Sequence, residues 1–457
     1  MSNRFEPSYL DDGLAAAVDG RNFWVIPKSL CTRCGACHVI CPTNVIDFDS
    51  QEFPFIQTEG CINCGLCLKV CPGIEFDIPG EFQRRFGQPY SLAEMGGAYR
   101  KAYVGYSTDP SVRKAGSSGG VVTQILMAML NAGMVDGALV VGSSPDDPLT
   151  PRPYIARTEE EIRSAAQSKY VVVANTKVLR ELRQTQEKIA MVGIPCQLHG
   201  LIKLQALNKR LEQRVALTIG LACRGTLERE VVPEFLQMRH IDPQSVKKLG
   251  FRDGPYPGQI RAHFKDGRVQ ALHKYEIKDG AYNNLFRLYL PDRCISCPDY
   301  SAEFSDVMCS DIWSRGSDGE YLYPEGVTLV LCRTERGEKM IDSLVQSGYL
   351  ALQPISKPDV ERAYKRLHWE KKVLPFVRIA QQKRSGRRAP EYGLDVPVTL
   401  KDRLLAFFIQ MTFIFGKNPH TRRFMLRVLF SPIGETFAFL KIKYKKYRYR
   451  FNAGGAK

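Results

Sequence analysis

The chain has 457 residues, of which 44% are hydrophobic, 25% charged and 10% aromatic. These proportions are typical of two or three globular domains and exclude a wholly disordered chain, a collagen and a coiled coil. No apolar run reaches the roughly 18 uncharged residues that a membrane-spanning helix needs. The first residues lack the basic start and apolar stretch of a secretory signal, so we expect a cytoplasmic protein.

The net charge of +16 is concentrated at the C-terminal end of the chain. Residues Phe376 to Lys457 include 18 Lys and Arg but only 4 Asp and Glu, so the rest of the chain is nearly neutral. Charge on one terminal segment indicates an anionic partner there, which is a membrane surface, an acidic protein or a nucleic acid.

Eight of the 14 cysteines form two copies of the pattern C-x2-C-x2-C-x3-C, each followed by proline and 30 residues apart. This is the pattern of bacterial two-cluster ferredoxins, in which the fourth cysteine of each run binds the other cluster. We assign one [4Fe-4S] cluster to Cys31, Cys34, Cys37 and Cys71, and the other to Cys61, Cys64, Cys67 and Cys41. Zinc and disulfides are the alternatives, but zinc usually takes two close cysteine pairs, and disulfides are rare in reducing compartments.

Strand and helix patterns alternate from Ala98 onward. Five short apolar runs have the length and flanking residues of buried strands, at 102–106, 137–142, 170–174, 188–192 and 215–221. Helices are expected between them, at 119–131, from Thr176 and after Pro195. Such alternation favours a mainly parallel sheet with helices on its faces. Two further runs, 260–264 and 268–272, flank Lys-Asp-Gly and predict a hairpin.

These patterns predict a fold class and a set of domains. The fold class is an α+β ferredoxin-like two-cluster module, then an α/β domain with a mixed β insertion, then a helical basic C-terminal tail. The domains are an N-terminal arm (1–24), the ferredoxin domain (25–90), an oxidoreductase domain (95–375) and the basic tail (376–457).

The first predicted helix of the α/β domain opens with a segment of mostly small residues, Lys114-Ala115-Gly116-Ser117-Ser118-Gly119-Gly120. Free amide groups at a helix N-terminus can bind a phosphate or another anion. The alternative is a Gly/Ser turn in which a serine caps the helix.

Motifs in this order resemble the beta subunit family of coenzyme F-420 (deazaflavin) hydrogenases and dehydrogenases, in the form with a fused two-cluster ferredoxin. The resemblance covers about residues 25–360 and rests on these motifs: KAGSSGG (114–120), VDG (135–137), QSKYV (167–171), GIPCQ (193–197), LACRG (221–225), FRDG (251–254) and RCISCPDY…SDVMCSDIW (293–313). It implies a flavin-dependent oxidoreductase that carries FAD. The wider family includes reductases of chlorophyll-type pigments. After Phe251-Arg252-Asp253 the family typically has Lys, whereas this chain has Gly254 and then Pro-Tyr-Pro-Gly, so the contacts of that loop need not carry over.

The resemblance also implies which residues contact FAD. They are Ser117, Ser118, Gly119 and Gly120, with Ser168, Lys169 and Tyr170 near the flavin. Lys169 is the candidate catalytic residue, because a lysine beside a flavin stabilises the anionic reduced ring. The alternative for Lys169 is a surface charge that precedes a buried strand.

Six cysteines remain outside the ferredoxin module. Cys196 and Cys223 each follow a predicted strand, where α/β proteins build their sites, and Cys294 and Cys297 form a C-x-x-C pair. The resemblance implies a third [4Fe-4S] cluster at Cys196, Cys223, Cys294 and Cys297. The alternative is two structural cysteines beside a redox or zinc pair.

Further cysteine, histidine and aspartate residues lie near these motifs in the sequence or follow them. Cys309 is an alternative ligand, and Cys332 lies in an apolar run and is interpreted as core. His199 is interpreted as a core or surface histidine. Three aspartates follow the C-x-x-C pair, and they either orient the cluster or substrate or cap turns: Asp299, Asp306 and Asp311.

The basic tail combines apolar and cationic segments. A linker is expected at 381–395, apolar runs at 404–415 and 424–430, and alternating basic and aromatic residues at 441–450. This suits helices on the inner surface of a membrane or on a partner subunit. Helices that dock on the body of the protein, a solvated basic end and nucleic-acid binding are further alternatives, the last disfavoured.

The predicted function is that of an iron–sulfur flavoprotein oxidoreductase. Electrons move between the clusters and FAD, and hydride is exchanged with a small organic acceptor such as the deazaflavin coenzyme. One alternative is a ferredoxin-dependent reductase of a chlorophyll-type pigment or another small molecule. The other is a non-catalytic electron-transfer subunit of a membrane-associated complex. The expected partners are a ferredoxin or another redox subunit, and the organic acceptor.

Overall fold

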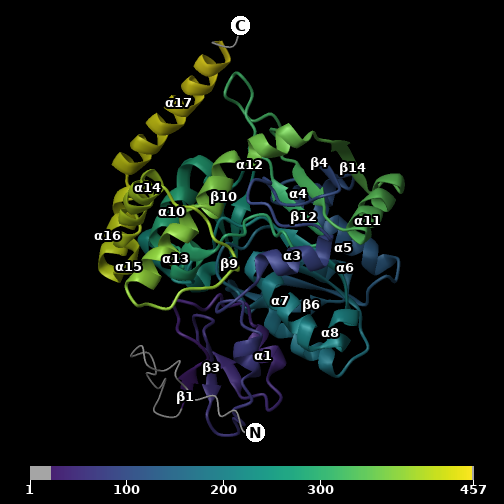
Figure 1. Cartoon of the computed structure of the whole chain (residues 1–457). Helices are drawn as coiled ribbons and strands as arrows, with labels where there is room; N and C mark the ends of the chain where they lie inside the picture. The colour runs from purple at the N-terminus through teal and green to yellow at the C-terminus, as the bar shows by residue number, and fades with distance from the viewer. Residues whose placement is uncertain (1–21, 455–457) are drawn as a thin grey trace.

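The computed structural model describes residues 22–454, so nearly all of the predicted arm at 1–24 lies outside the described residues. Figure 1 shows the ferredoxin module at one end of the molecule, an eight-stranded sheet in the middle and the C-terminal helices along one side. Within residues 22–454, no helix combines the length and apolarity that crossing a bilayer requires.

The ferredoxin module is a small antiparallel sheet with short helices. Its sheet has the order β1-β3-β2, from β1 (Asn22–Trp24), β2 (Ile46–Phe48) and β3 (Pro54–Gln57). The helices are α1 (Ala36–Ile40), α2 (Leu66–Lys69) and α3 (Ile78–Phe86). Gly35 and Gly65 precede α1 and α2 with φ angles of 98° and 68°, a left-handed conformation that glycine adopts without steric cost. They let the chain turn sharply between cysteines.

The central sheet has the strand order β14-β4-β13-β12-β8-β7-β5-β6. Its strands are β4 (Lys101–Ser107), β5 (Gly137–Ser144), β6 (Asp147–Ala156), β7 (Ile189–Gly193), β8 (Val215–Leu221), β12 (Val307–Asp311), β13 (Thr328–Cys332) and β14 (Leu350–Pro354). Only β5, β7, β8 and β12 pair in parallel; the other pairs are antiparallel. The expected mainly parallel sheet is therefore a mixed one, because β6 returns beside β5 through a tight hairpin and β13 folds back on β12.

One predicted strand is absent. In the run 170–174 only Val171 forms a bridge, with Leu227, and from Asn175 the chain winds into the 3-10 helix η2 (Asn175–Arg183). The apolar side chains of the run are buried without a neighbouring strand to pair along. Periodicity cannot distinguish such a buried segment from a buried strand.

Helices cover both faces of the sheet. Those of the α/β domain are α4 (Pro110–Ala115), α5 (Val121–Asn131), α6 (Glu159–Ser164), α7 (Pro195–Leu207), α8 (Lys209–Arg214), α11 (Glu335–Gln346) and α12 (Lys357–Lys372). Helices α5, α6 and α11 pack on one face around Ile125 and Ile341. On the other face α7, η2 and α12 share a core with the ferredoxin module, so the module is a continuation of the body.

The β insertion forms a third core. It contains the predicted hairpin, from β10 (Gln259–Phe264) and β11 (Val269–Ala271), with β9 (Val246–Asp253) paired on the other side of β10. The flanking helices are α9 (Val231–Met238), η3 (Pro243–Ser245), η4 (Ile277–Ala281), α10 (Tyr282–Tyr289) and η5 (Asp292–Ser296). Leu426 and Phe430 of the C-terminal region complete this core.

The C-terminal region is helical, as expected. Its helices are α13 (Leu374–Arg384), α14 (Leu400–Met411), α15 (Ile414–Lys417), α16 (Pro419–Leu429) and α17 (Pro432–Gly454). The predicted boundary at residue 375 falls inside α13, and the segment expected as a linker follows the surface of the body, where Tyr392 is buried. The backbone N–H groups of Phe76 and Ile78 donate to Glu391 and Tyr392 (2.9 and 3.1 Å).

Candidate functional site

The eight cysteines of the ferredoxin module lie in two groups that exchange their fourth members. Burial raises the pKa of Cys31, and the nearby Cys71 thiol raises it further. Burial raises the pKa of Cys67 to about 11, and Cys64, Cys61 and Cys41 contribute to the shift. Cys71 therefore lies with the first run of cysteines and Cys41 with the second, which is the exchange that the spacing predicts.

The two groups differ in exposure. Cys31, Cys34, Cys37 and Cys71 are buried, and we call them the inner set. In the outer set (Cys61, Cys64, Cys67 and Cys41), Cys64 is exposed and Cys61 and Cys67 are partly exposed. The adjacent Ile62 is 64% exposed. The outer set therefore reaches the molecular surface, whereas the inner set is enclosed by the rest of the chain.

The inner set lies directly against the α/β domain. A Cβ atom added at Gly200, in the middle of α7, would be 3.0 Å from the Sγ atom of Cys34. Buried Arg33 donates two hydrogen bonds to Glu228, at 2.6 and 2.8 Å. The N–H group of Thr176 donates to the carbonyl of Cys34 at 3.1 Å. These contacts fix the module against α7, against η2 and against the segment that follows β8.

The third cysteine set gathers in one pocket. Cys196 lies in the first turn of α7, Cys223 follows β8, and Cys294 and Cys297 lie in and after η5. All four line a pocket that Cys31 of the inner set also lines. Burial raises the pKa of Cys196, and Cys297, Cys223 and Cys294 raise it further. The fold thus assembles these four thiols from three segments that are distant in sequence.

The donor set of this pocket fits an iron–sulfur cluster. Buried cations need compensating charge, and Arg293 (5% exposed) and Lys371 (6% exposed) both line the pocket. Cys297 and Cys196 contribute to the raised pKa of Arg293, although its burial opposes the shift. Within residues 22–454, no three His, Cys, Asp or Glu side chains are grouped closely enough to hold a single metal ion.

The two remaining cysteines lie elsewhere. Cys309 in β12 and Cys332 in β13 are 2% and 0% exposed and belong to the core of the sheet face that α5 and α11 cover. Burial raises the pKa of Cys309, and the only thiol that adds to the shift is Cys332. The interpretation of Cys332 as core is confirmed, and the alternative of Cys309 as a ligand has no support from this placement.

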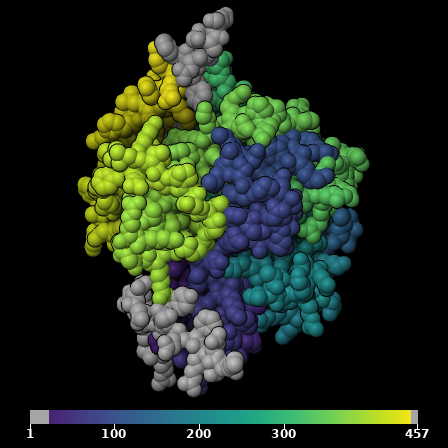
Figure 2. Space-filling model, viewed as in Figure 1, coloured from purple at the N-terminus to yellow at the C-terminus, as the bar shows by residue number. Residues whose placement is uncertain are grey.

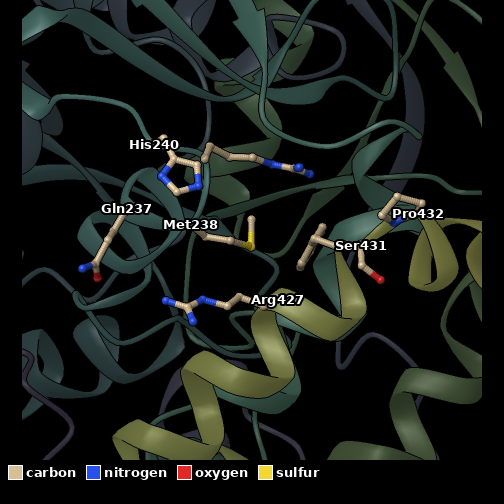
Figure 3. Close-up of a pocket in the computed structure, with 8 residues that line it drawn as sticks. Gln237, Met238, His240, Arg427, Ser431 and Pro432 are labelled. Atoms are coloured by element: carbon tan, nitrogen blue, oxygen red, sulfur yellow. The ribbon is translucent and has the colours of Figure 1, made fainter.

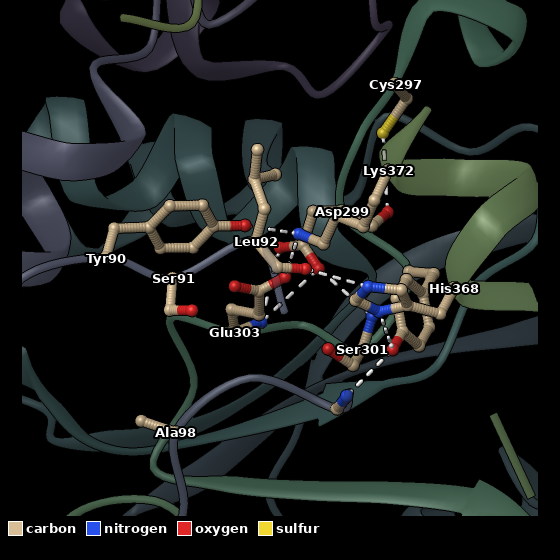
Figure 4. A network of polar contacts seen from close by, with 12 residues as sticks. Tyr90, Ser91, Leu92, Ala98, Cys297, Asp299, Ser301, Glu303, His368 and Lys372 are labelled. Carbon is tan, nitrogen blue, oxygen red and sulfur yellow. Dashed lines mark hydrogen bonds and ion pairs between the residues drawn. The ribbon is translucent and has the colours of Figure 1, made fainter. Parts of the chain in front are cut away.

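Asp299 connects the third set to a polar network (Figure 4). Its carboxylate accepts hydrogen bonds from the N–H groups of Ser301 (3.0 Å) and Glu303 (3.2 Å), and its carbonyl accepts from Cys297 (3.5 Å). The carboxylate also accepts from the ring of His199 (3.1 Å). The His199 ring stacks on Phe76 with centroids 3.9 Å apart. Asp299 therefore caps the turn beside Cys297, and His199 is a hydrogen-bonded core residue.

The other two aspartates serve different parts of the fold. Burial alone would raise the pKa of Asp306, but Arg85, Arg336 and Thr218 hold it below its usual range. Asp306 thereby ties α3, β8 and α11 together. Asp311 pairs with Arg252 at 2.5 Å.

The two segments that are predicted to contact FAD, 117–120 and 168–170, meet in the structure, and we call them together the FAD motif. Ser168 donates from its N–H group and its hydroxyl to the hydroxyl of Ser117, at 2.8 and 3.0 Å. Gly119 donates to the hydroxyl of Thr328 at 3.1 Å, and Gly120 has a φ angle of 72°. Helix α5 begins after Gly120 without a side-chain cap, so the serine-cap alternative is wrong.

Lys169 points toward the end of α6. Its ammonium group donates to the carbonyls of Ala165 (2.6 Å), Ala166 (2.6 Å) and Gln167 (3.1 Å). Burial lowers the pKa of Lys169 to about 7, and Lys248 adds to the effect. Three donated hydrogen bonds favour the charged form, because a neutral amine has only two N–H donors. Lys169 is therefore neither a solvated surface charge nor aimed at Ser117, and its role toward a flavin stays a prediction.

An aromatic pair beside the motif escaped sequence reasoning. The rings of Tyr256 and Trp313 stack with centroids 5.6 Å apart, and Arg252 lies 4.9 Å over Trp313. A Cβ atom at Gly326 would be 2.6 Å from the Tyr256 ring and 3.2 Å from the Cα atom of Ser118. Tyr256 belongs to the loop after Asp253 that departs from the family pattern. That departure is the feature of the sequence that could have drawn attention to the pair.

A second cavity lies away from these residues (Figure 3). It encloses about 520 Å³ between the end of α9 and helices α16 and α17, and its lining includes His240, Arg427 and Pro432. It contains no cysteine and none of the residues of the FAD motif.

The fold and the cysteine sets define an iron–sulfur oxidoreductase built on a mixed α/β domain. Residues 102–180 and 186–358 match the N- and C-terminal parts of the coenzyme F-420 hydrogenase/dehydrogenase beta subunit, and residues 30–73 match the 4Fe-4S dicluster domain. The chain belongs to this family of beta subunits, with a ferredoxin module fused at its N-terminal side.

The relatives of the chain are named for different activities. It is 26% identical over 347 residues to the coenzyme F-420-dependent sulfite reductase of Methanocaldococcus jannaschii, covering 73% of this chain and 49% of that protein. It is 28% identical to the coenzyme F-420 hydrogenase beta subunit of Methanothermobacter thermautotrophicus, covering 64% of this chain and 99% of the subunit. The chain thus spans about half of the first relative and nearly all of the second.

Two further similarities concern a plant enzyme and a solved structure. The chain is 27% identical to the 7-hydroxymethyl chlorophyll a reductase of Oryza sativa, covering 64% of this chain and 57% of that protein. A chain of the F-420-reducing [NiFe] hydrogenase complex from Methanosarcina barkeri superposes with a TM-score of 0.52 at 24% identity, covering 65% of this chain and 97% of that one. This superposition supports the fold.

Proposed function

We propose that this chain relays single electrons through three [4Fe-4S] clusters to FAD, which exchanges hydride with a small organic acceptor. The observation that carries the proposal is a continuous series of cysteine sets from the surface to the sheet edge. The series begins at exposed Cys64, passes through the buried inner set and reaches the third set, whose Cys196 begins the helix against which Cys34 packs. Direct packing between carriers is what electron transfer needs.

In this proposal each cysteine set binds one cluster. The outer set takes the cluster that exchanges electrons with a ferredoxin or another redox subunit, because Cys64 is exposed. The inner set holds an intermediate carrier. The third set holds the last one, and Arg293 and Lys371 supply positive charge beside four thiolates. The clusters supply one-electron chemistry, and the protein supplies spacing and charge.

FAD is assigned to the segments around Ser117 and Ser168. The N-terminus of α5 offers backbone amides to a phosphate group. Two buried polar atoms beside it have no partner among the described residues, a terminal nitrogen of Arg252 and the hydroxyl of Tyr256. Buried polar groups are normally hydrogen-bonded, so both are available to a bound group. When bound, FAD supplies two-electron hydride chemistry in contact with one-electron carriers.

The acceptor proposed is a planar conjugated molecule. The stacked pair Tyr256 and Trp313 presents aromatic surface beside the FAD motif, and Arg252 adds a buried positive charge. A deazaflavin fits this description. A chlorophyll-type pigment fits it too, and the similarity to the rice reductase favours it as the second candidate.

The first test is anaerobic purification of the full chain with iron, sulfide and FAD counted. We expect about twelve irons and one FAD per chain, since each of three clusters holds four irons. Cys294→Ser with Cys297→Ser should lower the count by about four irons, while the control Cys309→Ala should not. About eight irons in the native chain would remove the third cluster. Iron without flavin, after FAD is supplied, would leave only an electron-transfer subunit.

A further inference from the structure

The C-terminal helices expose stripes of apolar side chains. In α17 the residues Ile433, Phe437, Leu440, Tyr444 and Tyr447 recur at spacings of four and three, and each is at least 55% exposed. Residues at these spacings lie on one face of a helix. A similar stripe runs along α14 from Leu400, which is 72% exposed, to Phe408, which is 64% exposed. Single exposed apolar residues are ordinary, but aligned stripes on neighbouring helices form a patch.

Helix α16, which lies between α14 and α17 in the chain, is fixed to the body, and Ala406 of α14 is buried against Leu374 and Val377 of α13. Buried Glu234 of α9 accepts hydrogen bonds from Arg422 (2.7 and 3.0 Å), Arg423 (3.2 Å) and Tyr289 (2.7 Å). Leu426 and Phe430, at the inner side of this region, are 1% and 5% exposed. The apolar patch is therefore a fixed outward face rather than the surface of a loose tail, and Figures 1 and 2 show the helices gathered along one side of the molecule.

Helix α17 has two different sides. Phe439 stacks on Tyr275 with centroids 6.0 Å apart, and the backbone of Lys446 lies against Gly319. These residues attach one side of α17 to the body, while the stripe from Ile433 to Tyr444 remains exposed to solvent. The body therefore does not cover this apolar stripe, which is exposed to a binding partner.

The outward face is strongly cationic. Exposed basic residues accompany the stripes on α14, α16 and α17: Lys401, Arg403, Arg427, Lys441, Lys443 and Arg448. The only acidic residues from 400 to 454 are Asp402, which caps α14 with Thr399, and Glu435, which pairs with Arg239 of the body. Both acidic groups are engaged by the protein, so the face carries positive charge beside apolar stripes.

We propose that this face binds an anionic phospholipid surface, with α14 and α17 lying in the plane of the interface. Apolar stripes flanked by Lys and Arg are typical of helices that insert into the headgroup region, and tyrosines such as Tyr444 and Tyr447 favour that depth. A protein partner is the weaker alternative, because the centres of protein interfaces are depleted in lysine, whereas lysines interleave with this stripe. The proposal concerns attachment and does not depend on the redox chemistry.

The test is flotation of the full-length protein with vesicles of phosphatidylcholine, with and without phosphatidylglycerol. We expect binding to the anionic vesicles, at least tenfold weaker binding to the neutral ones, and loss of binding at high salt. Ile433→Ser with Phe437→Ser and Leu440→Ser should abolish binding. The matched control Val269→Ser with Leu322→Ser, which alters exposed apolar residues outside the tail, should bind as the native protein does.

A second variant separates charge from apolar contact. Lys441→Gln with Lys443→Gln and Arg448→Gln should weaken binding to anionic vesicles about 100-fold and leave weak binding to neutral vesicles unchanged. Equal binding of the native chain and the stripe variant, or no binding to either vesicle, overturns the proposal. The proposal is also overturned if the native protein self-associates without vesicles and the stripe variant does not. The face would then pair with a second copy of the chain.

Discussion

Gly200 offers the sharpest test of how the ferredoxin module joins the α/β domain. It lies in the middle of α7, and a Cβ atom there would be 3.0 Å from the Sγ atom of Cys34 and 3.2 Å from the Cβ atom of Ala36. Ordinary contacts between such atoms lie at about 3.5–4.0 Å. Gly200→Val therefore requires Cys34 to move by several tenths of an ångström or α7 to separate from the module.

The expected cost follows from two opposing effects. Replacing glycine in a helix interior gains a few tenths of a kcal/mol for valine, since glycine is the poorer helix former. Overpacking a well-packed core costs about 1–3 kcal/mol, and it dominates here because the contact is with a buried cysteine that is predicted to bind a cluster. We expect a net loss of about 1–2 kcal/mol, centred on the inner set rather than on the outer one.

The assay combines iron counting, low-temperature EPR of the reduced protein and thermal melting followed by cluster absorbance. Gly200→Val should alter or remove the signal of the inner cluster and lower its melting midpoint, while the outer cluster keeps its signal. Ala206→Val is the control, because Ala206 is an exposed residue of the same helix. If Gly200→Val behaves like Ala206→Val, α7 does not pack on Cys34 and the proposed electron route loses its central contact.

Three further predictions concern stability and cofactor binding. Arg422→Met leaves Glu234 buried without its main partner, so the free energy of unfolding in urea should fall by about 3–5 kcal/mol, and Arg422→Met with Glu234→Gln should recover most of the loss. The pKa of Asp306 in the folded protein lies below its unfolded value of about 3.9, because Arg85 and other partners outweigh the effect of burial. The ionised carboxylate therefore stabilises the fold fully above about pH 3.9, and this stabilisation is lost as the pH falls through the folded-state pKa. Urea unfolding between about pH 5 and pH 2 should show this slope, and Asp306→Asn should flatten it. Gly119→Ala would bring a methyl group against the carbonyl of Gly105, so it should lower FAD retention, measured by flavin fluorescence, with no loss of iron.

Local patterns made the cysteine sites predictable. The two C-x2-C-x2-C-x3-C runs predict both sets of ligands and the exchange of Cys41 and Cys71, because only a short turn separates neighbouring ligands. Local pattern placed Cys196 and Cys223 at strand ends on one edge of the sheet. Their grouping with Cys294 and Cys297 came from the family resemblance, and the structure brings all four thiols to one pocket.

Features that depend on distant partners were not predictable. The run at 170–174 has the composition of a strand, but Leu227 is its only bridge partner among the described residues, and no local feature of the sequence indicates that a partner strand is missing. Tyr256 and Trp313 are 57 positions apart and meet only once β9 and β12 are in place. The exposure of the apolar residues in α14 and α17 likewise depends on which side of each helix the body covers.

The positions of the outer cysteine set and of the lipid-binding face determine how they can work together. Figure 1 shows the ferredoxin module at one end of the molecule, while α17 runs along the side and away from that end. A chain attached by α14 and α17 therefore keeps the end that carries the ferredoxin module clear of the contact, open to a redox partner that is in solution or on the same membrane. Attachment raises the effective concentration of a partner on the same surface without any new contact between the two proteins. Electron transfer from a membrane-bound donor should then depend on Phe437 and Leu440, whereas transfer from a soluble donor should not.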